Sequence, residues 1–164
     1  MSAPAWLRKI PRWSAVALVA AAWVGWSSCA SPSVHLPWLS DTALARDTAR
    51  RQGRPILMDF TGSDYCAPCQ KLAREIYDTP TFARYAASNL VLLIVDFPAW
   101  KELPPAQTQA NQALADQFKI EGYPTVVLVD AEMKEIGRFT DIRAGTPAEF
   151  IADVEKLIHP TRLR

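Results

Sequence analysis

The feature that most constrains this chain is a pair of cysteines, Cys66 and Cys69, which are one helical turn apart and follow an apolar run. Residues 56–60 have the composition of a buried strand. Beyond the cysteines, Leu72 and Ile76 continue at helical spacing. The pattern therefore predicts a strand, a short turn and a helix, with both thiols at the start of the helix.

Two thiols in this position have the geometry of a redox pair. A helix N-terminus presents unpaired N–H groups and the positive end of the helix dipole. Such sites lower a thiol pKa from about 8.5 to roughly 3.5–7.5. We therefore expect Cys66 to be the nucleophile and Cys69 to be a more buried, resolving thiol. A structural disulfide and half of a zinc site are the alternatives, but the second cysteine pair or nearby Cys–His pair that zinc needs is absent from the sequence.

Length and charge limit the possible classes of protein. A chain of 164 residues with 49% hydrophobic residues predicts one domain with a real core, preceded by an N-terminal segment. The net charge is +1, and three basic residues within the first 29, where there is no acid, leave −2 for the remainder. This balance indicates neither a nucleic acid nor an anionic surface as a partner.

Residues 1–29 have the organisation of an export signal, with a basic start, an apolar segment and small residues around Cys29. The apolar segment, residues 13–26, is shorter than the roughly 20 residues that span a bilayer. Cys29 suits two cleavages, because Ser28-Cys29-Ala30 fits ordinary signal peptidase and Ser27-Ser28-Cys29 resembles the end of a bacterial lipobox. We expect lipidation at Cys29, with soluble release and an uncleaved anchor as the alternatives.

Residues 30–39 are expected to be a linker, whose Trp38 and Leu39 pack on the edge of a domain spanning residues 40–160. The first helix of that domain is predicted over residues 41–52, capped by Ser40 or Asp41 and ended by Gly53. A last helix is predicted to begin with a capping box at Thr146-Pro147-Ala148-Glu149 and to run through Ile158.

The middle of the chain alternates apolar and polar segments. Residues 91–97 predict a strand covered on both faces. A loop is predicted over residues 98–109, which hold three prolines and Trp100, and it either contacts substrate or is a mere insertion. A short helix over residues 111–118 follows. The apolar run after Pro124 and residues 134–139 then predict an antiparallel hairpin.

The order of these elements resembles the thioredoxin superfamily over about residues 38–158. Residues 60–72, which read Phe-Thr-Gly-Ser-Asp-aromatic-Cys-x-x-Cys followed by Lys-Leu, are similar to a group of exported bacterial thioredoxin-like proteins. Residues 95–98 and 122–125 are also similar to that group. The resemblance implies an α/β, thioredoxin-like fold with a central mixed sheet flanked by helices. It also implies a protein thiol-disulfide oxidoreductase without a cofactor.

The same resemblance implies roles for further residues. Substrate binding falls on five of them, Tyr65, Ala67, Pro68, Tyr123 and Pro124. The Tyr123–Pro124 bond is implied to be cis, which costs little only before proline. Asp59 matches the family's buried acid, and because burial raises a carboxyl pKa, it is implied to accept the proton of Cys69.

Two features depart from thioredoxin itself. Ala67-Pro68 stands where thioredoxin has Gly-Pro, and residues 91–97 lack the lysine that thioredoxins place near the buried acid. The redox potential and the direction of electron flow are therefore not implied by the resemblance.

We expect thiol-disulfide exchange in the periplasm, by a protein that is free or lipid-anchored to a bacterial membrane through Cys29. The expected partners are protein or small thiol and disulfide substrates and a membrane electron donor. Pro68 is similar to the proline of the reducing thioredoxins, so a reductase is the expected direction. A disulfide oxidase or isomerase, a non-catalytic binding lipoprotein and a copper-handling protein are the alternatives. No metal ligand is expected, because His35 and His159 lie outside the predicted site.

Overall fold

Four strands form a mixed sheet in the order β2-β1-β3-β4. The strands are β1 (Ile56–Thr61), β2 (Val91–Asp96), β3 (Thr125–Val129) and β4 (Glu135–Phe139). Strand β1 is parallel to β2 and antiparallel to β3, and β3 pairs antiparallel with β4 as the predicted hairpin. This computed structural model describes residues 36–140, 142 and 145–160, all within one compact unit. The predicted α/β fold with a central mixed sheet is confirmed.

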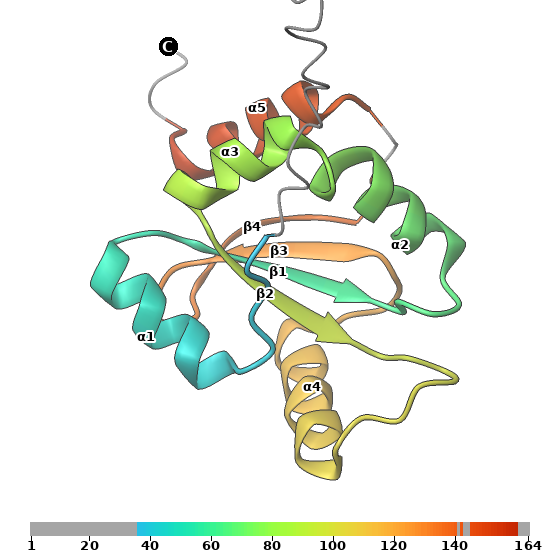
Figure 1. Cartoon of the computed structure of the whole chain (residues 1–164). Coiled ribbons are helices and arrows are strands. Elements are labelled where there is room, and N and C mark those ends of the chain that lie inside the picture. Colours follow the sequence, from blue (N-terminus) through green and yellow to red (C-terminus); the bar gives the residue numbers. More distant parts are fainter. Residues whose placement is uncertain (1–35, 141, 143–144, 161–164) are drawn as a thin grey trace, which may run out of the picture. The chain divides into compact units, whose positions relative to one another are not determined.

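Helices cover both faces of the sheet (Figure 1). One face packs against α1 (Thr42–Gln52) and α4 (Pro105–Phe118). The other packs against α2 (Ala67–Leu72), α3 (Pro80–Asn89) and α5 (Pro147–Ile158). Because side chains alternate along a strand, the β1 residues at 56, 58 and 60 enter the first core and Leu57 enters the second. Asp59 therefore points toward the layer that contains α2.

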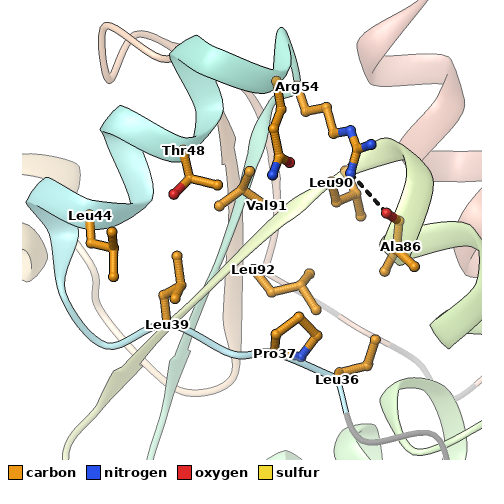
Figure 2. Close-up of a pocket in the computed structure, with 12 residues that line it drawn as sticks. Leu36, Pro37, Leu39, Leu44, Thr48, Arg54, Ala86, Leu90, Val91 and Leu92 are labelled. Atoms are coloured by element: carbon orange, nitrogen blue, oxygen red, sulfur yellow. Dashed lines mark hydrogen bonds between the residues drawn. The ribbon is translucent and has the colours of Figure 1, made fainter.

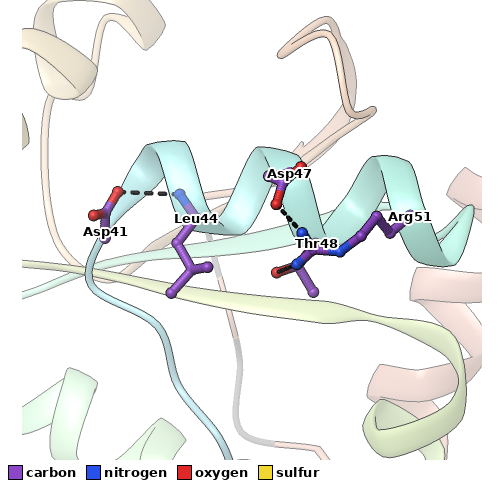
Figure 3. A network of polar contacts seen from close by, with 5 residues as sticks. All are labelled: Asp41, Leu44, Asp47, Thr48 and Arg51. Atoms are coloured by element: carbon purple, nitrogen blue, oxygen red, sulfur yellow. Dashed lines mark hydrogen bonds and ion pairs between the residues drawn. The ribbon is translucent and has the colours of Figure 1, made fainter.

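The predicted ends of the first helix are confirmed. Asp41 is the N-cap of α1. Its Oδ1 accepts a hydrogen bond from the N–H of Ala43 at 2.7 Å, and a second from the N–H of Leu44 at 3.1 Å, which Figure 3 shows. Gly53 ends the helix in the left-handed region, with φ 63°, where glycine is unstrained. On the same helix, Asp47 and Arg51 form an ion pair one turn apart (Figure 3). The capping box predicted at the start of α5 is also present.

The prediction of a loop over residues 98–109 and a helix only over 111–118 was wrong, because α4 begins at Pro105. Two adjacent prolines favour a loop in a sequence, but proline also suits the first position of a helix. The N–H groups of Gln107 and Thr108 both donate to the carbonyl of Pro104, which starts the helix. The buried Asn111 then fixes α4 to the sheet, since its Nδ2 donates to the Asp96 carbonyl at 2.7 Å.

The segment before α1 lies along the free edge of β2. Leu39 accepts a backbone hydrogen bond from Ile94, at 2.8 Å, and donates one to Leu92, at 2.9 Å, which forms a parallel bridge. Trp38 packs on Tyr77 with ring centroids 5.1 Å apart. Beside this segment, an apolar pocket lies between α1, α3 and β2 (Figure 2). Trp38 and Leu39 thus pack on the domain edge, as predicted.

Residues 1–35 lie outside the described part of the chain. They hold the expected export signal, the expected lipidation site Cys29, and His35. In the part that the structure does describe, none of the helices is both long and apolar enough to cross a membrane.

Candidate active site

Cys66 and Cys69 are joined by a disulfide bond, with their Cα atoms 5.2 Å apart. Cys66 is the N-cap of α2, and its Sγ accepts a hydrogen bond from the backbone N–H of Cys69 at 3.2 Å. Cys66 is 8% exposed and Cys69 is 4% exposed. Both cysteines are buried, and Cys66 is the slightly more exposed of the two, which is the predicted order.

The turn between β1 and α2 is fixed by backbone and side-chain contacts. The Cys66 N–H donates to the Gly62 carbonyl at 2.9 Å, which closes the turn. Ser63 next to it makes two bonds to the Asp96 carboxylate at the end of β2, from its N–H at 2.9 Å and from its hydroxyl at 2.6 Å. The cysteines therefore stand on a turn that is fastened to the neighbouring strand.

A carboxylate within the turn itself, that of Asp64, reaches the loop that follows β2. Asp64 accepts hydrogen bonds from three consecutive N–H groups, those of Ala99 and Trp100 at 2.8 Å and that of Lys101 at 3.0 Å. Slight burial raises the pKa of Asp64, but these backbone bonds outweigh it, and the net shift is downward. Asp64 therefore stays ionised and holds the loop against the cysteine turn.

Asp59 is a buried carboxyl near the resolving cysteine. It lines one pocket together with Cys69 and Tyr77. The pKa of Asp59 is raised from 3.8 to about 7. Burial raises it most, the nearby Tyr77 hydroxyl lowers it, and the charge of Asp96 adds to the rise. Within the described residues, Asp59 Oδ1 and the Tyr77 hydroxyl have no hydrogen-bond partner of normal geometry. A buried carboxyl with this pKa can exchange a proton near neutrality.

The predicted substrate-binding residues lie around the same end of the sheet. Ala67 and Pro68 are exposed at the start of α2. The Tyr123–Pro124 bond is cis, and it immediately precedes Thr125, which pairs with Phe60 near the end of β1. The β3 register therefore brings this turn to the end of β1 that carries the cysteines.

Aromatic rings line this end of the molecule. The rings of Tyr123 and Phe97 are stacked, with centroids 5.2 Å apart and planes 18° from parallel. Burial, and then the neighbouring Tyr65 phenol, raise the pKa of Tyr123, which indicates that the two tyrosines are close. Tyr65 and Tyr123 thus come together from different elements beside the disulfide.

Sequence reasoning did not single out Asp64, Asp96 or Tyr77 as parts of the site. The contacts of Asp64 and Ser63 join residues that are more than 30 positions apart, so a local sequence pattern does not predict them. Tyr77 ends a π-helical turn, η2 (Ala73–Tyr77), that continues α2, and it lines the same pocket as Asp59. Among the residues that the structure describes, no group of three or more potential metal ligands occurs.

Comparison with known proteins gives a consistent result. A family model described as thioredoxin-like matches residues 37–131. The disulfide bond reductase DsbH of Chlamydia pneumoniae is 33% identical over 126 residues, which cover 77% of this chain and 75% of that protein. A solved structure of a DsbH oxidoreductase is 34% identical, with a TM-score of 0.72 over 79% of this chain and 87% of the other.

A second relative in the same organism, the thioredoxin-related protein DsbJ, is 30% identical over 65% of this chain, although the match covers only 30% of DsbJ. The disulfide between Cys66 and Cys69, at the junction of β1 and α2, lies within the region that the family model matches. The chain belongs to the thioredoxin-like family and is a thiol-disulfide oxidoreductase of the Dsb type.

Proposed function

We propose that this protein reduces disulfide bonds of exported proteins outside the cytoplasm. The observation that carries the proposal is its 33% identity, over three quarters of both chains, to a protein named disulfide bond reductase. The position of the Cys66 sulfur supports it, because Cys66 caps a helix and its sulfur accepts a backbone N–H bond. Both features stabilise a thiolate, which is the attacking species in disulfide exchange.

In the proposed first step, the Cys66 thiolate attacks one sulfur of the substrate disulfide. A mixed disulfide forms, and the other substrate sulfur leaves as a thiolate. Cys69 then loses its proton and attacks Cys66, which releases the second substrate sulfur. The substrate gains two electrons and, with two protons, becomes a dithiol, while Cys66 and Cys69 become the disulfide seen in the structure.

Asp59 is the proposed acceptor of the Cys69 proton. The two residues line the same pocket, and the pKa of about 7 makes the carboxyl partly ionised at neutral pH. Tyr65, Ala67, Pro68, Tyr123 and Pro124 are proposed to contact the polypeptide on either side of the mixed disulfide. Their support is their position around the end of β1.

The proposed location is the periplasm, with residues 1–29 as the export signal and Cys29 as a lipid anchor. In an oxidising compartment the protein must be returned to its dithiol form by a donor. A membrane protein that supplies thiol electrons is the proposed donor. Loss of palmitate labelling in Cys29→Ser would support the anchor, and continued labelling would refute it.

Insulin reduction with dithiothreitol tests the activity. Wild type is expected to accelerate the reaction, and Cys66→Ser to abolish the acceleration. Cys69→Ser should retain the attacking sulfur and accumulate mixed disulfides, which non-reducing electrophoresis detects. Equal rates for wild type and Cys66→Ser would refute catalysis by this pair.

The direction of electron flow is tested separately by equilibrating the cysteine pair with glutathione redox buffers. A reductase is expected to have a reduction potential nearer the roughly −270 mV of thioredoxin than the roughly −120 mV of a strong oxidant. A value near the latter would assign the protein to disulfide formation instead.

A further inference from the structure

Two large hydrophobic side chains are exposed on the cysteine turn and on the loop that is hydrogen-bonded to it. Trp100 is 77% exposed and Tyr65 is 45% exposed, whereas most other large apolar side chains of the described residues are covered. Tyr65 directly precedes Cys66. Its ring lies over Gly62, where an added Cβ would be 2.6 Å from the ring. The ring is therefore held by the same turn that holds the Cys66 sulfur.

Trp100 reaches this location from a distant part of the sequence. Its backbone N–H donates to Asp64 Oδ2, and the N–H groups on either side of it donate to the same carboxylate. Three bonds to one charged acceptor are stronger than three bonds between neutral groups. These bonds fix the loop at Trp100 itself. The residue that accepts them, Asp64, is two residues before Cys66 in the sequence.

The loop around Trp100 has no net charge, so it would not select a charged partner. Lys101 and Glu102 follow Trp100, both are exposed, and their charges cancel. The neighbouring ring pair of Phe97 and Tyr123 adds further aromatic surface. The chemistry that this surface can bind is therefore apolar or aromatic rather than ionic.

We propose that Tyr65 and Trp100 form a recognition surface for apolar side chains that flank the cysteine of a disulfide-bonded polypeptide, and that Asp64 is the residue that positions it. This inference rests on the proposed function, because it assumes a polypeptide substrate. A large aromatic ring already fixed by its loop loses little conformational freedom on binding. Aromatic side chains in such a position contribute much of the free energy of an interface.

The inference makes substrate size and polarity decisive. A small disulfide such as bis-hydroxyethyl disulfide has no flanking side chain for this surface, so it should need only Cys66 and Cys69. A peptide disulfide with leucine and phenylalanine beside its cysteine should use the surface. A matched peptide with serine and glycine at those positions should not.

The test compares kcat and KM for these three disulfides in wild type, Trp100→Ala, Trp100→Phe and Asp64→Ala. For the apolar peptide, Trp100→Ala should raise KM about tenfold, equivalent to about 1.4 kcal/mol, with little change in kcat. Trp100→Phe should restore most of the affinity. Asp64→Ala should shift KM in the same direction. Leu44→Ala is the matched control, because Leu44 is also a large exposed side chain, 46% exposed, but lies on α1 beside the pocket of Figure 2.

The outcomes separate this inference from the proposed function. If wild type reduces both peptides and Trp100→Ala leaves every KM unchanged, the recognition surface is refuted while the reductase stands. If Trp100→Ala slows all three disulfides equally, Trp100 supports the site rather than recognition, and the inference is also refuted. If wild type reduces no peptide disulfide, the proposed function itself fails. A Trp100→Ala variant whose only change is lost self-association would assign the surface to a second copy of the chain.

Discussion

The buried carboxyl of Asp59 predicts a specific dependence of stability on pH. Its pKa is 3.8 in the unfolded chain and about 7 in the folded protein, chiefly because burial disfavours the charged form. Between these two values the folded state binds more protons than the unfolded state, so the free energy of unfolding falls as pH rises. The stability contributed by the protonated carboxyl is present at low pH and is lost as pH rises through about 7.

The magnitude follows from the two pKa values. One pKa unit corresponds to about 1.36 kcal/mol, so ionised Asp59 should destabilise the fold by about 4 kcal/mol well above pH 7. Between pH 5 and pH 8, the same two values give a loss of about 2.6 kcal/mol. Replacing Asp59 with asparagine removes the titration while keeping the shape of the side chain.

Urea unfolding of the oxidised protein at pH 5 and pH 8 measures this difference, since the disulfide keeps the two thiols from titrating. Wild type should lose about 2.6 kcal/mol more than Asp59→Asn over this range. Glu102→Gln, which removes an exposed carboxylate, should behave as wild type does. Parallel curves for wild type and Asp59→Asn would refute the assignment of a raised pKa to this residue.

Three further results are expected. In Tyr77→Phe, the pKa of Asp59 should rise above that of wild type, because the Tyr77 hydroxyl lowers it; carboxyl chemical shifts followed against pH measure this, and an unchanged midpoint would contradict it. Asp41→Ala should reduce the free energy of unfolding by about 1 kcal/mol through loss of the α1 cap, as seen by urea titration. Asn111→Ala should cost about 1–3 kcal/mol, because the half-buried carbonyl of Asp96 loses its partner; a change below 0.5 kcal/mol would argue against this anchor.

Much of the fold could be predicted because its signals are local. Asp41 and Gly53 mark the ends of α1 through the conformations that their own residue types favour. The strand at residues 91–96 could be predicted because five consecutive apolar residues precede Asp96 and helices cover both faces of the sheet. The redox pair could likewise be predicted from the spacing of Cys66 and Cys69.

The elements that were mispredicted or missed depend on contacts between distant segments. Pro104 and Pro105 are ambiguous in a sequence, and the bond that fixes their helix to the sheet joins Asn111 to the Asp96 carbonyl, 15 residues away. Asp64 appears in the sequence as one residue of a motif, but its carboxylate acts on a loop 35 residues away. A single sequence carries the residue types of such contacts and not their pairing.

The bridge that Leu39 makes to β2 has a consequence for the solubility of shortened forms of the protein. A sheet has two open borders, and an unpaired strand there is a template for strand addition by another molecule. Strand β4, at one border, carries the charged residues Glu135 and Arg138, which oppose the addition of another strand. Strand β2, at the other, is almost wholly apolar, and the segment containing Leu39 is what occupies it. A chain cut at Ser40 would keep both cysteines but expose this border, and oligomers joined through β2 are the expected product.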